Sequence, residues 1–280
     1  MTSCRIALSV DPAHHDRLVA ELSDWGAEGF EELDHVLVAF FPESEWDSVE
    51  PAVERLVAGM GGERVGPVER LEDRNWNADW EATIQPIDVD PFWIRASWND
   101  GTVPEGRTVV VIDPKMSFGT GYHETTRLML RNLARFVRPG DRVLDAGTGT
   151  GVLGIAALLK GASHCIGFDI DEWSTDNATE NALRNDVGDR FEVREGDETT
   201  VPETGFGLVM ANINRNALLA MLDWLLSRTA RDGTLGLSGL LMTDRDDMMD
   251  ALAAREVAVI AEEREGEWWS VWVRHATGNH

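Results

Sequence analysis

A short apolar stretch that ends in an acid and three alternating glycines constrains this chain more than any other feature. Residues 143–146 carry Asp145, and Gly147, Gly149 and Gly151 follow directly. Glycines at these positions permit positive φ angles and let main-chain N–H groups approach a ligand where a Cβ would intrude. A buried strand, this loop and a helix beginning at about residue 152 therefore predict a nucleoside site at the end of a parallel strand.

A second carboxylate, Asp169, ends the next apolar run, where it can accept hydrogen bonds from both hydroxyls of a ribose. The glycine loop also satisfies the dinucleotide pattern over residues 149–154, so the loop alone does not separate NAD from S-adenosyl-L-methionine. Asp145 favours the second ligand, because a sulfonium carries positive charge and no phosphate, whereas a pyrophosphate near an acid is repelled. A tight turn without a ligand is the third interpretation.

Charge and hydropathy exclude several classes of partner. The 280 residues include 50 acidic and 25 basic side chains, a net charge of −25, which disfavours nucleic acid and favours a basic partner. Much of this excess is what a hydrated surface in a salty cytoplasm requires. We see neither a membrane-spanning run nor a signal-peptide pattern, and therefore expect a cytoplasmic protein without membrane association. Cys4 and Cys165 suggest neither a disulfide nor a metal site.

Periodicity divides the chain into two domains. Residues 1–60 predict a small α+β module, ferredoxin-like. Glycines and a proline then indicate a linker over residues 61–80, and residues 81–280 form the larger domain. The elements expected in the small module are strands at 5–10, 29–32 and 35–41 and helices at 12–25 and 43–59.

In the larger domain helices alternate with strands, as in a doubly wound parallel sheet. The turn near Gly266 is so short that the last two strands must be antiparallel. Seven strands with an antiparallel C-terminal strand are the usual α/β sheet of class I methyltransferases. The expected strands are 143–145, 164–169, 191–194, 206–211, 234–238, 257–262 and 268–273, after strand-like segments at 84–89, 92–97 and 108–112.

Five motifs, in this order, resemble the ribosomal protein L11 methyltransferase family. They are the run FGTGYHETT at 118–126, the glycine loop at 145–151, GFDID at 167–171, ANI at 211–213 and LSGLL at 237–241. A tryptophan-containing lead at 71–76 and the closing GEWW at 266–269 extend the likeness over nearly the whole chain. By this resemblance, residues 1–60 would be the family's substrate-recognition domain.

The resemblance implies roles for individual residues. S-adenosyl-L-methionine would be contacted at Thr126, Gly147, Asp169 and Asn212, and the loop containing Phe118, Thr120 and His123 would fold over the methyl-donor end. The family trimethylates lysine side chains and the N-terminal α-amine of ribosomal protein L11, which would be the partner here. The expected cofactor-binding residues are Thr126, Asp145, Gly147, Gly149, Gly151, Asp169 and Asn212, and the expected catalytic residues are Asn212, Phe118, Thr120 and His123.

Methyl transfer from a sulfonium needs positioning more than acid–base power, because the donor is already activated. The Asn212 amide oxygen can orient a neutral amine, and His123 is either a base or a structural hydrogen-bonding group. Residues 214–217, NRNA, depart from the family's usual pattern, which keeps a different amine substrate open. A nicotinamide-dependent oxidoreductase or a non-catalytic nucleotide-binding module is the remaining alternative.

Overall fold

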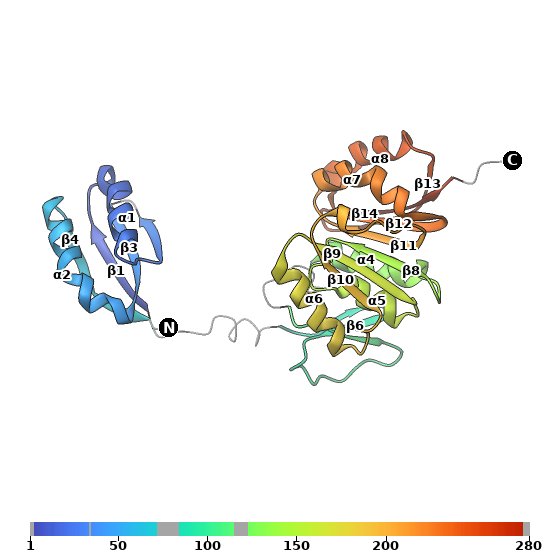
Figure 1. Cartoon of the computed structure of the whole chain (residues 1–280), viewed down its shortest axis with the longest axis horizontal. Coiled ribbons are helices and arrows are strands. Elements are labelled where there is room, and N and C mark those ends of the chain that lie inside the picture. Colours follow the sequence, from blue (N-terminus) through green and yellow to red (C-terminus); the bar gives the residue numbers. More distant parts are fainter. Residues whose placement is uncertain (1–2, 34, 72–83, 115–122, 277–280) are drawn as a thin grey trace. The chain divides into compact units, whose positions relative to one another are not determined.

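The computed structural model describes residues 3–33, 35–71, 84–114 and 123–276. The chain divides into two compact units, residues 1–83 and 84–280 (Figure 1). The tryptophans at 76 and 80 and the expected site residues Phe118 and Thr120 lie outside the described residues.

The first unit is a four-stranded antiparallel sheet with two helices. The strand order is β2-β3-β1-β4, and every neighbouring pair is antiparallel, which is the ferredoxin-like arrangement expected. Side chains of β1, β3 and both helices, among them Ile6, Leu18 and Trp46, share one buried core. The elements are β1 (Ser3–Ser9), α1 (His15–Asp24), β2 (Gly29–Leu33), β3 (Val36–Pro42), α2 (Glu43–Gly59) and β4 (Glu63–Leu71).

Strand β4 corrects the expected linker, which was wrong for residues 63–71. These residues pair with β1, so they belong to the sheet of the first unit. Arg5 pairs with Glu69 and Ala7 pairs with Val65, so β4 has two extra residues between these pairs. Gly66, with a φ of +80°, lies within this irregularity. A bulge in an edge strand tolerates a positive-φ glycine and the missing N–H of Pro67. The same glycine and proline indicate a linker when only the sequence is read.

The second unit is built on a seven-stranded sheet in the order β10-β9-β8-β11-β12-β14-β13. Strands β8 to β12 are parallel to one another, whereas β14 runs antiparallel to both of its neighbours. This confirms the class I methyltransferase sheet expected. The strands are β8 (Arg142–Ala146), β9 (His164–Asp169), β10 (Phe191–Glu195), β11 (Phe206–Asn212), β12 (Thr229–Leu241), β13 (Val257–Glu265) and β14 (Trp268–His275).

Alternating side chains of the central strands supply two cores, one on each face of the sheet. Leu208 and Met210 of β11 pack with one cluster, while Val209 and Ala211 between them pack with the other. Period-two alternation with both sets apolar is what a sheet covered on both faces requires. Helices α4 (Glu124–Phe136) and α5 (Val152–Leu159) contribute to the first cluster, and α7 (Arg215–Arg228) and α8 (Arg245–Ala253) to the second.

A small third sheet precedes the large one in the sequence. Strands β5 (Ile87–Val89) and β6 (Phe92–Arg95) are antiparallel, and β7 (Thr108–Val111) is parallel to β6. Phe92 and Val110 pack into the same core as α5, so this sheet is part of the second unit. Its outer strand β7 lies against α6 (Glu172–Arg184), a contact that bears on the site. Among the described residues, no helix is long and apolar enough to cross a membrane.

Candidate active site

The candidate site lies where the order of the parallel strands reverses. The chain leaves β8 toward β9 and β10 on one side and returns to β11 and β12 on the other. The carboxyl ends of β8 and β11 therefore border a crevice, which is where ligands of doubly wound sheets bind. Asp169 ends β9 and Asn212 ends β11, so both face this edge of the sheet.

A cavity of about 530 Å³ occupies this crevice. That volume lies within the range of small-molecule sites, about 300–1,000 Å³. None of the described lining residues is lysine or arginine, whereas three are acidic. The lining residues are His123, Thr125, Gly147, Gly149, Phe168, Asp169, Ile170, Ser174, Asp197, Glu198, Asn212, Ile213, Asn214, Ala217, Met221, Gly239 and Trp268.

The glycine loop crosses from the end of β8 to the end of β9. The Gly147 N–H donates to the Phe168 carbonyl at 2.9 Å, and the Gly149 N–H donates to the Asp169 carboxylate at 3.0 Å. Gly147 has a φ of +70°, and a Cβ there would stand 2.3 Å from Ile213 Cγ2. Glycine at this position therefore lets the β11–α7 connection close against the loop and complete the cavity wall.

Three of the expected cofactor residues lie behind this wall. Gly151 begins α5 with a φ of +81°, and a Cβ there would stand 3.1 Å from both Ala178 and Phe191, so the glycine serves helix packing. Thr126 is fully buried, and its hydroxyl accepts a long hydrogen bond of 3.4 Å from the Asn212 amide. Asp145 is 1% exposed. Their contact with a cofactor stays a prediction.

Asp145 is a buried carboxyl group with an incomplete set of partners. Its Oδ2 accepts from the Thr148 hydroxyl at 2.9 Å and from the Gly154 N–H at 3.1 Å. Its Oδ1 is buried and has no hydrogen-bond partner among the described residues. Burial raises the pKa of Asp145 to about 7 against the opposing effect of these two hydrogen bonds, and the nearby Asp169 charge raises it further. The group is thus poised between its two protonation states near neutral pH.

Asn212 presents the other buried and incompletely bonded polar group of the site. Its amide nitrogen is bonded to Thr126, but its Oδ1 is buried without a partner in the described part of the chain. A buried acceptor of this kind is costly unless something donates to it. Since Asn212 lines the cavity, a donor on a bound molecule would satisfy it.

His123 begins α4 and lies beside an aromatic wall. Its Nδ1 accepts from the Thr125 N–H at 3.3 Å and lies 2.8 Å from the Thr125 hydroxyl, which makes the imidazole the N-cap of the helix. Its ring contacts Trp268 edge to face, with centroids 4.6 Å apart. This geometry favours the structural interpretation of His123, because the nitrogen is already engaged by the helix.

Sequence reasoning missed several lining residues, including Asp197 and Glu198 in the turn after β10. The available signal was the repetition of acids after successive parallel strands, at 145, 169 and 197. It also missed the function of Asn214, whose side chain accepts from the Ala217 N–H and caps α7. The sequence NRNA at 214–217 therefore supplies a helix cap.

In the described ranges no group of three or more His, Cys, Asp or Glu is arranged to hold a metal ion.

The strand order, the glycine loop and the acid at the end of β9 define a class I methyltransferase. The model of the family described as "Ribosomal protein L11 methyltransferase (PrmA)" matches residues 6–276, and the chain belongs to this family. It is thus an S-adenosylmethionine-dependent protein methyltransferase, which decides against the nicotinamide alternative.

Individual relatives agree with the family match. The chain is 39% identical to the ribosomal protein L11 methyltransferase of Chlorobaculum tepidum, over 96% of this chain and 95% of that protein. It is 36% identical to the same-named protein of Thermus thermophilus, over 90% and 92% respectively. A crystal structure of ribosomal protein L11 methylase from Lactobacillus delbrueckii subsp. bulgaricus superposes with a TM-score of 0.64 at 28% identity, covering 69% of this chain and all of that one.

The raised pKa of Asp145 predicts a pH-dependent stability. The folded protein protonates this group more readily than the unfolded chain, where an aspartate titrates near about 3.9. Its stabilising contribution is therefore complete at low pH and is lost as the pH rises through about 7. In Asp145→Asn the group stays neutral, so the stability of the variant relative to wild type should rise by on the order of 3 kcal/mol between about pH 4 and about pH 8.

Urea denaturation across this pH range measures the difference. The matched control is Asp189→Asn, at a side chain that is 82% exposed, which should show no such rise. A flat difference for Asp145→Asn would contradict the shifted pKa.

Proposed function

We propose that the protein transfers methyl groups from S-adenosyl-L-methionine to lysine side chains and the N-terminal α-amine of ribosomal protein L11, in the cytoplasm. The observation that carries the proposal is the cavity lined by both Asp169 and Asn212, in which the buried Asn212 amide oxygen has no partner in the described part of the chain. Family membership and the names of the relatives support this acceptor.

The cavity residues fit the cofactor. Each Asp169 carboxylate oxygen accepts one protein hydrogen bond, from Gly149 N–H and from Asp171 N–H, which leaves an acceptor position on each for a ribose hydroxyl. Phe168 and Ile170 offer apolar surface to a purine. Since the described lining carries three acids and neither lysine nor arginine, it suits a cationic sulfonium and opposes a pyrophosphate.

Asn212 supplies the polar contact for the acceptor. S-adenosyl-L-methionine supplies an activated methyl group on a sulfonium. A lysine amine has an ordinary pKa near about 10.4, so the site must take up its neutral form. The Asn212 Oδ1 would accept an N–H of this amine and so orient its lone pair toward the donor. When the cofactor is bound, the new N–C bond would form as the C–S bond breaks, and the methylated amine would release its proton to water. We assign Phe118 and Thr120 to the same acceptor side, while His123 orders the start of α4.

The charge of the chain supports a basic protein substrate. A net charge of −25 attracts a cationic partner and repels nucleic acid. We assign substrate recognition to the first unit, whose boundary we now set after Thr83 because β4 belongs to its sheet.

Mass spectrometry of ribosomal protein L11 incubated with the enzyme and S-adenosylmethionine tests the proposal. We expect mass increments of whole methyl groups on lysines and on the N-terminus. If L11 stays unmodified while another protein or a small amine gains methyl groups, the proposed substrate is wrong and the methyltransferase assignment stands.

Removing residues 1–83 should separate binding of the cofactor from recognition of the protein. The remaining chain, 84–280, keeps every described cavity residue, so S-adenosylmethionine should bind with nearly unchanged affinity. Methylation of L11 should collapse. Full-rate methylation by the truncated enzyme, measured with the same mass assay, would show that the first unit does not recognise L11.

Replacing Asp169 with alanine should weaken cofactor binding. Hydrogen bonds to a charged group contribute about 1.5–3 kcal/mol each, so we expect the dissociation constant for S-adenosylmethionine to rise at least about tenfold. Titration calorimetry measures it. Asp176→Ala, which removes an exposed carboxylate from α6, the helix that follows β9, is the control and should bind as the wild type does. Wild-type affinity in a folded Asp169→Ala protein would refute the ribose contact.

Replacing Asn212 with aspartate tests the orienting role. The variant keeps the shape of the side chain but adds a negative charge, which favours the protonated and unreactive amine. Turnover at saturating cofactor should fall, and the pH–rate profile should move to higher pH, since more alkali is needed to free the amine. A weaker cofactor affinity with an unmoved pH profile would instead mean that Asn212 holds only the cofactor.

A further inference from the structure

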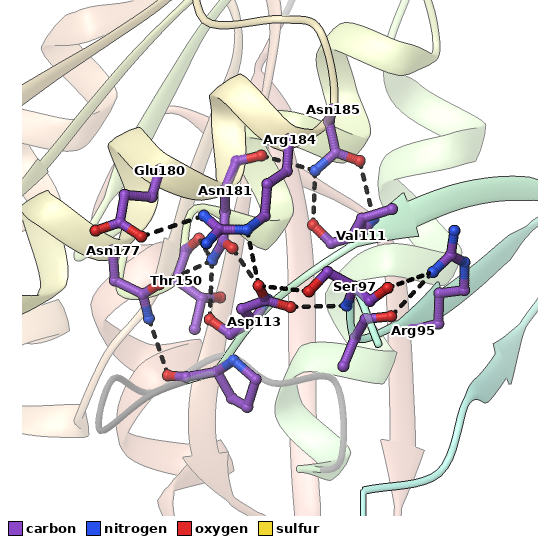
Figure 2. Close-up of polar contacts among 12 residues, drawn as sticks. Arg95, Ser97, Val111, Asp113, Thr150, Asn177, Glu180, Asn181, Arg184 and Asn185 are labelled. Carbon is purple, nitrogen blue, oxygen red and sulfur yellow. Dashed lines mark hydrogen bonds and ion pairs between the residues drawn. The ribbon is translucent and has the colours of Figure 1, made fainter. Parts of the chain in front are cut away.

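Two asparagines near the end of α6, Asn181 and the C-cap Asn185, bind the main chain of β7 and its extension as a neighbouring strand would. Asn185 accepts from the Val111 N–H at 2.8 Å and donates to the Val111 carbonyl at 2.6 Å. Asn181 does the same for Asp113, accepting at 3.0 Å and donating at 3.3 Å. Figure 2 shows these side-chain amides reaching from the helix to the strand.

The geometry of the two elements explains the pairing. Four residues of a helix rise about 6 Å. Two residues of a strand advance about 6.6 Å. Side chains at i and i+4 on α6 therefore meet alternate residues of the strand, whose outward N–H and C=O groups would otherwise lie unpaired at the sheet edge. We call Asn177, Asn181 and Asn185 the amide ladder.

Asn181 does more than pair with the strand. Its amide nitrogen also lies 3.0 Å from the Thr150 carbonyl, so the same side chain bonds the glycine loop (Figure 2). Asn177 donates to the Pro114 carbonyl at 2.9 Å, at the last described residue before residues 115–122. Both side chains are buried, with exposures of 1% or less. Asn185, one turn farther along, bonds the strand but not the glycine loop.

Asp113 is fixed from the opposite side as well. Its carboxylate accepts from the Ser97 N–H at 2.7 Å and from the Ser97 hydroxyl at 2.9 Å, and it forms an ion pair of 2.7 Å with Arg184 of α6. The end of the β7 extension is therefore tied to α6 through both its main chain and its side chain. The Asn181 amide extends that connection to the glycine loop.

We infer that Asn181 is a positioning residue for methyl transfer, which holds the Asp113–Pro114 end of the strand at a fixed place relative to the glycine loop. The inference rests on the proposed function, in which the glycine loop borders the methyl donor. Gly147 and Gly149 keep their own bonds to Phe168 and Asp169. Loss of the Asn181 amide therefore affects how the glycine loop aligns the bound donor more than it affects cofactor affinity.

Kinetics of Asn181→Ala, with Asn185→Ala as the matched control, test the inference. Because small displacements of reacting groups have large effects on rate, kcat of Asn181→Ala should fall about tenfold or more. Its dissociation constant for S-adenosylmethionine should stay within about twofold of wild type. The control loses the same kind of strand pairing, so it should lower the melting temperature but keep kcat within about threefold. Equal losses of kcat in the two variants, or an unchanged kcat in Asn181→Ala, would overturn the inference.

Hydrogen exchange in the protein without cofactor gives a second measurement that does not depend on activity. In Asn181→Ala the amides of Asp113 and of residues 147–151 should exchange faster together, whereas in Asn185→Ala the increase should be confined to the strand near Val111. Unchanged exchange in the glycine loop of Asn181→Ala overturns the inference. Should this variant fail to unfold cooperatively, Asn181→Ser replaces it, since its side chain is polar but lacks the amide that reaches Thr150; a lower kcat with unchanged cofactor affinity is expected, and a wild-type kcat is the contrary result.

A failure of the proposed function is recognised separately. It appears as absence of L11 methylation by the wild-type enzyme. In that case the exchange experiment still tests whether Asn181 holds the end of the strand to the glycine loop.

Discussion

The hydrogen bond from the Gly149 main chain to the Asp169 carboxylate is the interaction on which the site depends. It ties the loop after β8 to the end of β9, so two segments twenty residues apart become one surface. The carboxylate keeps free acceptor positions because the loop takes only part of its capacity. Once the loop is held there, Gly147 admits Ile213 and the wall formed by the end of β11 closes against it. The rest of the cavity follows from strand order.

The site contrasts with the surface in how it handles charge. The surface carries a large excess of carboxylates, which water and salt screen easily. The single carboxyl group buried beneath the glycine loop, Asp145, has no such screening, and its pKa rises to about 7. The acids that line the cavity form an intermediate case, since they are open to a ligand and add a negative potential to it. The potential is therefore negative both at the surface and in the cavity, and both attract cations.

The local parts of this picture were predictable from the sequence and the long-range parts were not. The glycine loop, Asp169 and a seven-stranded sheet with an antiparallel C-terminal strand follow from short patterns and from alternation, and the structure has them. Strand β4 was not predicted from the sequence, because its bulge contains Gly66 and Pro67 and so has the composition of a linker. Thr126 shows a different limit, because a motif indicates proximity to the site but not whether a side chain lines the cavity or supports a residue that does. The bond between Asn181 and Thr150 joins residues 31 positions apart and has no local signature.

The amide ladder also restricts how α6 can vary. A helix turns by about 100° per residue, so one inserted or deleted residue between Asn177 and Asn185 would rotate part of the ladder away from the strand. Substitutions on the exposed side of α6 meet no such restriction, and Trp173, 77% exposed near its start, is on that side. Length is therefore more tightly constrained in this helix than composition. We therefore expect homologous chains that keep the ladder to align through α6 without gaps.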